Sequence, residues 1–175
     1  LNVVLIAAAA MLMAACTENT NLTSPDGEIN VSFNISQEGV PHYQVSAYGQ
    51  DVINESGLGL KAEQAELGKG FAITKVRRSS KDEQWEQPWG ENKVMRDNHS
   101  EMAVEMENAE GVKLTLRFKA FDDGVGYRYE YDATAAGVDS LTIIGDRTHF
   151  NFAQDGTCWS IGSYFSGYEL PYREQ

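Results

Sequence analysis

Between positions 85 and 101 the sequence gathers side chains that suit the recognition of a sugar. Trp85 and Trp89 offer indole rings, and the apolar face of a pyranose can stack on an indole. Residues able to donate or accept hydrogen bonds follow them: Glu91, Arg96, Asn98 and His99. This grouping predicts a substrate-binding surface or a contact with another domain. Packing of the indoles onto the protein, and hydrogen bonding within a loop, are the alternatives.

Two adjacent aspartates raise the question of a metal site. Asp122 and Asp123 precede Gly124 and lie between two segments of alternating polar and apolar residues. Asp and Gly are typical turn residues, because Asp bonds its own backbone and Gly accepts a positive φ. A calcium loop of the EF-hand type needs oxygens at several fixed offsets and a distal glutamate, which this stretch lacks. The sequence therefore predicts a turn here.

The N-terminal residues predict export and lipidation. Residues 3–15 are all apolar, but this run is shorter than the roughly 20 residues needed to span a bilayer, and it suits a signal peptide. The run ends in two alanines and Cys16, a pattern that resembles the acylation site of bacterial lipoproteins. We expect a signal peptide at residues 1–15, a lipid anchor on Cys16 and a tether at 16–23. A periplasmic or outer-membrane (cell-surface) lipoprotein follows; an ordinary signal peptide with an accidental cysteine is the alternative.

Composition indicates a globular domain and excludes one class of partner. The chain has 175 residues, of which 42% are hydrophobic and 23% charged, and its formal net charge is −12. This proportion of apolar residues is typical of a folded domain. The negative balance argues against nucleic acid as a partner, because phosphates are bound mainly by Lys and Arg.

Most of the remaining sequence has the two-residue period of β-strands. Strands are expected at residues 28–35, 42–48, 51–53, 71–78, 101–107, 112–118, 127–131 and 141–144. The polar stretch at residues 79–98 is expected to be a long loop that carries the two tryptophans. Many short strands with frequent turn residues predict an all-β fold, an antiparallel β-sandwich.

Several motifs together resemble a known family. They are SPDGEINVSF near the start, GLGL at residues 57–60, WEQPWGE at 85–91, RDNHSE at 96–101 and FDDGVGYRYE at 121–130. In this order they resemble the N-terminal domain of glycoside hydrolase family 97, which comprises exported bacterial α-glucosidases and α-galactosidases. The resemblance covers residues 24–175 and implies a β-super-sandwich that is incomplete at its C-terminal end.

The resemblance also implies that catalysis and calcium binding involve a second domain. Family members carry their catalytic carboxylates on a (β/α)8 barrel, so no catalytic residue is expected in this chain, which alone should be inactive. They also depend on calcium shared between domains, and by position Glu169 resembles the ligand that the N-terminal domain donates. The expected partners are the barrel, an α-linked oligosaccharide and, through Cys16, a membrane. A non-catalytic carbohydrate-binding sandwich and a purely structural one are the competing functions. Glucose or galactose specificity and the stereochemical course remain open.

Overall fold

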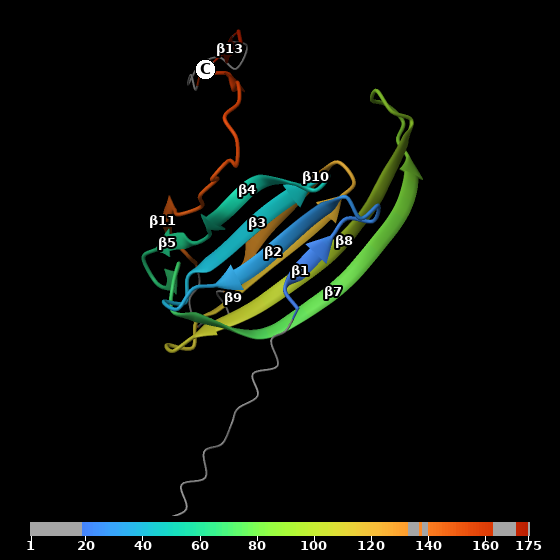
Figure 1. The fold of residues 1–175 in the computed structure, drawn as a ribbon. Coiled ribbons are helices and arrows are strands. Elements are labelled where there is room, and N and C mark those ends of the chain that lie inside the picture. The colour runs from blue at the N-terminus through green and yellow to red at the C-terminus, as the bar shows by residue number, and fades with distance from the viewer. Residues whose placement is uncertain (1–18, 133–136, 138–139, 163–170, 175) are drawn as a thin grey trace, which may run out of the picture.

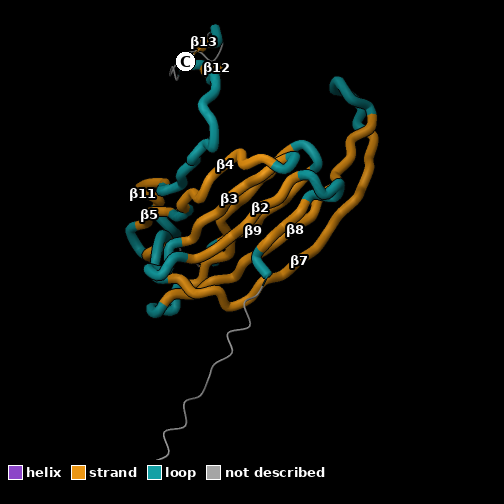
Figure 2. The backbone as a smooth tube through the Cα atoms, viewed as in Figure 1, coloured by secondary structure: helices purple, strands orange, loops and turns teal. Residues whose placement is uncertain are grey.

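The computed structural model describes residues 19–132, 137, 140–162 and 171–174. These residues form thirteen strands and no helix, and all paired strands are antiparallel (Figure 2). The expected all-β class with antiparallel pairing is therefore confirmed.

The first of the two large sheets has four strands. They are hydrogen-bonded in the order β1 (Asn21–Thr23), β2 (Ile29–Ile35), β3 (Pro41–Ala47) and β4 (Gln50–Gly57). In β2, Ile29, Val31 and Phe33 are buried and alternate with polar residues, as a strand with one face on a core requires. The β1–β4 sheet therefore has an apolar inner face and a polar outer face.

The second large sheet has longer strands. Its order is β10 (Gly124–Glu130), β9 (Lys113–Phe121), β8 (Val94–Asn108) and β7 (Phe71–Glu86). In β9 every second residue from Leu114 to Ala120 is buried. Only Asp122 and Asp123 separate β9 from β10, so the expected turn is present, although it is narrower than the expected break. Gly124 and Gly126 belong to β10.

The core lies where the inner faces of these two sheets meet (Figure 1). Phe33 of β2 contacts Phe118 of β9 with ring centroids 5.8 Å apart, and Tyr43 of β3 contacts Tyr127 of β10 at 5.7 Å. Burial of each large apolar side chain contributes roughly 1.5–3 kcal/mol. These contacts hold the two sheets face to face.

Short strands close one side of the molecule. Three form a small sheet: β11 (Ile143–Asp146), β5 (Leu60–Ala62) and β6 (Glu66–Leu67). Residues 147–153 then run beside β4 and join residues 52–59 through four backbone hydrogen bonds of 2.8–3.0 Å. They cover an edge that would otherwise expose unpaired backbone groups. Farther along, β12 (Trp159–Ser160) pairs with β13 (Arg173–Glu174).

The expected loop at residues 79–98 is wrong. Strands β7 and β8 continue through most of it, and only residues 87–93 connect them. The residues of this stretch are largely exposed on both faces, so no apolar alternation marks it as strand.

Candidate functional site

A two-stranded arm projects from the β7–β10 sheet. Strand β9 pairs with β8 only from Ser100 onward, so residues 81–99 form a ribbon of β7 and β8 alone. Figure 1 shows this hairpin arm extending beyond the β1–β4 sheet. At its tip, Gly90 has φ +115°, and the backbone N–H of Gln87 donates to the carbonyl of Lys93 at 3.0 Å. Glycine is suited to this conformation because it has no Cβ.

The arm exposes its two tryptophans. The exposed fraction is 48% for Trp85, on β7, and 83% for Trp89, at the tip. Val94, at the start of β8, is 53% exposed. Among the described residues, neither indole is buried against the sandwich, and packing of the indoles against a barrel stays a prediction. Exposed aromatic surface of this kind is available to a sugar or to another domain.

Arg96 and Asn98 lie on one face of the arm. The guanidinium of Arg96 donates two hydrogen bonds of 2.7 Å to the carboxylate of Asp82, and Asn98 stands opposite Asp82 in the strand register. The bond from Arg96 lowers the pKa of Asp82. A bidentate pair fixes the orientation of the guanidinium, although both side chains are about half exposed and the pair contributes little to stability. Glu91 lies apart from them, exposed in the tip loop.

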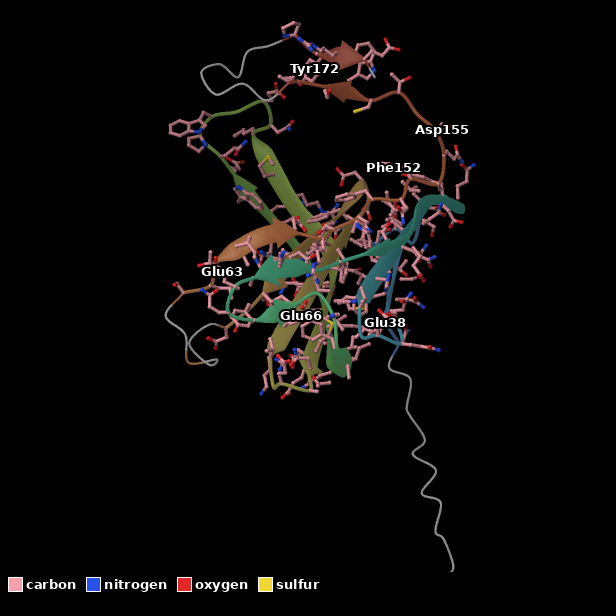
Figure 3. All side chains as sticks on the ribbon, turned by 90° about the vertical axis from the view of Figure 1, so that its left-hand side faces the viewer. Glu38, Glu63, Glu66, Phe152, Asp155 and Tyr172 are labelled. Carbon is pink, nitrogen blue, oxygen red and sulfur yellow. The ribbon has the colours of Figure 1, made fainter. Side chains whose placement is uncertain are left out.

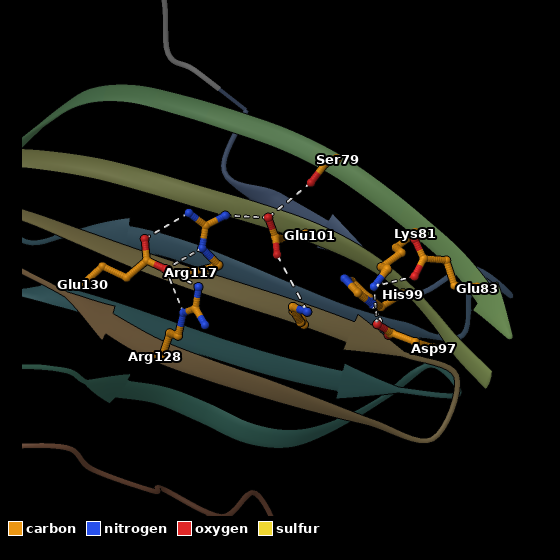
Figure 4. Close-up of polar contacts among 10 residues, drawn as sticks. Ser79, Lys81, Glu83, Asp97, His99, Glu101, Arg117, Arg128 and Glu130 are labelled. Atoms are coloured by element: carbon orange, nitrogen blue, oxygen red, sulfur yellow. Dashed lines mark hydrogen bonds and ion pairs between the residues drawn. The ribbon is translucent and has the colours of Figure 1, made fainter. Parts of the chain in front are cut away.

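His99 lies on the opposite face, at the root of the arm. It is only 3% exposed, and its Nδ1 is 2.5 Å from the carboxylate of Asp97, which Lys81 also approaches at 3.3 Å (Figure 4). Its ring packs on Phe121 with centroids 5.1 Å apart. The hydrogen bond from His99 lowers the pKa of Asp97. The six residues singled out in the sequence thus share one arm but are divided between its tip and its two faces.

An ion-pair network that is not among the sequence-based predictions lies on the same face as His99. Arg117 donates to Glu130 at 2.7 and 2.9 Å and to Glu101, while Arg128 also binds Glu130 (Figure 4). These contacts, first the bond from Arg117, lower the pKa of Glu130 to about 2. The hairpin register places Arg117 directly opposite Arg128. Two arginines opposite each other repel, and Glu101 and Glu130 offset this repulsion. The pairing of Arg117 with Arg128 follows from a hairpin that turns at Asp122 and Asp123, so the sequence offered a signal for these glutamates.

Three turns meet at the end of the molecule that bears the arm. The backbone N–H of Asp26 donates to the Asp122 carboxylate at 3.0 Å, so the β9–β10 turn is tied to the loop between β1 and β2. The same loop accepts a 2.9 Å hydrogen bond from the N–H of Tyr48, in the β3–β4 turn. Asp122 therefore serves as a turn residue and as a link between the two sheets.

The metal and lipid predictions fall outside the described residues. Neither Glu169 nor Cys16 is among them. Within the part of the chain that the structure describes, no group of three or more His, Cys, Asp or Glu side chains could hold a metal ion. A search of the same residues finds no helix with the length and apolar character needed to cross a membrane.

Comparisons with known proteins place this fold among glycoside hydrolases. A family 97 enzyme from Pseudoalteromonas sp. strain K8, solved with acarbose, has a TM-score of 0.79 and 35% identity, covering 89% of this chain and 24% of that one. A variant of a family 97 enzyme from the same strain, solved with panose, also gives 0.79 and 35%, covering 88% and 24%. A beta-arabinopyranosidase shares the fold, with a TM-score of 0.76, 22% identity and coverage of 89% and 26%.

The sequence comparisons are more specific. A probable retaining alpha-galactosidase of Streptomyces bingchenggensis (strain BCW-1) is 27% identical over 121 residues, which are 69% of this chain and 18% of that protein. The chain thus spans about a quarter or less of these relatives. The family model described as Glycosyl-hydrolase 97 N-terminal matches residues 22–175. The chain therefore belongs to glycoside hydrolase family 97 and corresponds to its N-terminal domain.

Proposed function

We propose that this chain is the N-terminal β-super-sandwich of an exported α-glycosidase, where it supports a catalytic (β/α)8 barrel and helps to shape the sugar pocket. The family match supports the general role. The observation that carries the finer one is the hairpin arm, with Trp85 and Trp89 exposed on a two-stranded ribbon. Relatives crystallised with panose and acarbose make an α-linked oligosaccharide the proposed substrate.

The arm suits a contact with a second domain or with sugar for a physical reason. An isolated two-stranded ribbon is at best marginally stable in water, and this one has no core under its tip. Covering an exposed indole contributes on the order of 2 kcal/mol. A barrel packed against the arm would supply that cover, and any indole left at the rim would face the substrate. Arg96, Asn98 and Glu91 would then add polar contacts.

The test is Trp89→Ala in the complete enzyme, with Lys93→Ala in the same tip loop as the control. A pocket role lowers kcat/KM for panose about tenfold, the factor that corresponds to 1.4 kcal/mol, and leaves the melting temperature unchanged. A domain-contact role lowers the melting temperature instead. If Trp89→Ala matches Lys93→Ala in both measurements, the arm has neither role.

The chemical step is proposed to need residues outside this chain. Glycoside hydrolysis requires two carboxyl groups that flank the scissile bond. We assign no catalytic residue here and expect the purified 175-residue chain not to cleave a p-nitrophenyl α-glycoside. Turnover by this chain alone would refute the assignment. Such turnover would also count against the two competing proposals, which are a non-catalytic carbohydrate-binding lipoprotein and a structural sandwich.

We also propose that Glu169 donates one ligand to a calcium ion shared with the barrel. Calcium takes six to eight oxygen ligands, and one carboxylate supplies one or two. The absence of a ligand cluster among the described residues is compatible with a shared site but does not test it. In the complete enzyme, Glu169→Gln should weaken calcium binding measured by calorimetry, whereas the control Glu174→Gln should not. Equal affinities would count against the assignment.

The remaining proposal concerns location. A signal peptide at residues 1–15 and a diacylated Cys16 would anchor the protein to a membrane after export, because two acyl chains give stable anchoring. Incorporation of labelled palmitate that disappears in Cys16→Ala would support this anchor. Unchanged membrane association of Cys16→Ala would refute it.

A further inference from the structure

The β3–β4 turn places an aromatic residue where a smaller one would be easier to accommodate. Tyr48 and Gly49 form this two-residue turn, with φ values of +53° and +75°. Asn, Asp and Gly are preferred in such turns, and a left-handed conformation costs a residue with a Cβ roughly 1–2 kcal/mol. The Tyr48 side chain is 68% exposed, so little packing within the domain offsets this cost. Its position is instead suited to an external contact.

A second exposed aromatic ring stands nearby on a fixed backbone. Phe152 is 70% exposed, on the segment between β11 and β12 that runs beside β4 (Figure 3). Hydrogen bonds on both sides hold this segment: the N–H of Asn54 donates to the carbonyl of Asn151 at 2.8 Å, and that of Ala153 donates to Val52 at 3.0 Å. Because β4 fixes the backbone at Phe152, the ring is presented from a defined position.

Tyr48 and Phe152 line one groove of about 410 Å³. Gln50, Gln154 and Asp51 add polar groups to its lining, and Val52 adds an apolar surface. Among the residues that the structure describes, no lysine or arginine lines the groove. The combination of aromatic rings with amide groups suits a neutral, polyhydroxylated ligand, since rings stack on apolar sugar faces and amides bond hydroxyl groups. A phosphate or another anion would find no cation there.

We infer that this groove, defined by Tyr48 and Phe152, is a carbohydrate-binding site for a neutral oligosaccharide chain, separate from the residues of the hairpin arm. Stacking on Tyr48 and Phe152 provides the affinity, and Gln50 and Gln154 orient the hydroxyl groups. The inference does not require the catalytic role proposed above. It assigns to this domain a capacity to hold a glycan of its own.

The test is affinity electrophoresis of the complete protein in native gels that contain amylopectin, dextran or galactomannan. Tyr48→Asn is the informative variant, because Asn tolerates the left-handed turn and should leave the fold as stable or more stable. Tyr48→Asn and Phe152→Ala should each weaken retention by at least one of these glycans about tenfold, as the loss of 1.4 kcal/mol of stacking gives. The control Trp159→Ala removes another exposed aromatic ring and should leave retention unchanged.

Three outcomes would overturn the inference. They are retention by none of the three glycans, equal retention of Tyr48→Asn and the wild type, and a Tyr48→Asn variant that is less stable than the wild type. The last result would mean that Tyr48 packs against another part of the protein. Hydrolysis of a p-nitrophenyl α-glycoside by the wild-type protein is scored separately. Hydrolysis without Tyr48-dependent retention would support the proposed enzyme role and refute the groove. Tyr48-dependent retention without hydrolysis would support the groove and not the enzyme role.

Discussion

The hydroxyl group of Tyr129 links the β7–β10 sheet to two neighbouring segments, and removing it tests this link. It accepts a 2.8 Å hydrogen bond from the backbone N–H of Gly59, which is buried, and lies 3.0 Å from Oγ1 of Thr148. Tyr129→Phe removes the acceptor and leaves the N–H of Gly59 unpaired. An unpaired buried donor costs about 1–3 kcal/mol, so we expect a loss of about 2 kcal/mol and a fall in melting temperature of roughly 4–8 °C.

Hydrogen exchange gives the local measurement. Exchange at the Gly59 amide should accelerate about 30-fold in Tyr129→Phe, which corresponds to 2 kcal/mol. Tyr127→Phe is the matched control, because Tyr127 lies on the same strand and its hydroxyl has no hydrogen-bond partner among the described residues. Unchanged protection of Gly59 in Tyr129→Phe, or equal acceleration in both variants, would refute the role of this hydroxyl.

Three further predictions concern stability. The pKa of Glu130 falls from 4.5 to about 2 on folding, so its stabilisation is present above pH 4.5 and is lost as the pH falls toward 2. Because this side chain is 31% exposed, the stabilisation amounts to about 1–2 kcal/mol. The free energy of unfolding in urea should therefore depend less on acid pH in Glu130→Gln than in the wild type. Identical slopes of free energy against pH would contradict this prediction. Gly39→Ala should unfold at lower urea concentration, because a Cβ would stand 2.4 Å from the backbone nitrogen of Phe71, and an unchanged midpoint would contradict the contact. Phe118→Ala should lose about 3–5 kcal/mol by thermal unfolding, since the ring is fully buried, and a loss below 1 kcal/mol would mean that the core refills the space.

The same hydroxyl group of Tyr129 also predicts an alkaline limit. Burial raises its pKa to about 12, above the ordinary value of 10.0. Its contribution to stability is therefore present below pH 10 and is lost as the pH rises toward 12. Tyr129→Phe should remove that part of the alkaline dependence.

The strands that face the core were predictable, and the arm was not. Residues such as Val31, Phe33, Leu116 and Phe118 alternate with polar neighbours because one face of each strand is buried. Residues 81–86 and 94–98 form strands with no core beneath them, so their polarity does not alternate and the sequence predicts a loop there. A pattern that arises from burial cannot mark strands whose two faces are both exposed.

The sequence by itself determined the all-β class, the turn at Asp122 and Asp123, and the resemblance to family 97. These features depend on local periodicity and on the order of motifs, which involve residues close together in the chain. Only the tertiary structure decided that Arg96 and His99 occupy opposite faces of the arm. It also decided that Tyr48 and Phe152, more than one hundred positions apart in the chain, share a groove. Those relations depend on strand register and on long-range packing, which bring together residues that no local pattern connects.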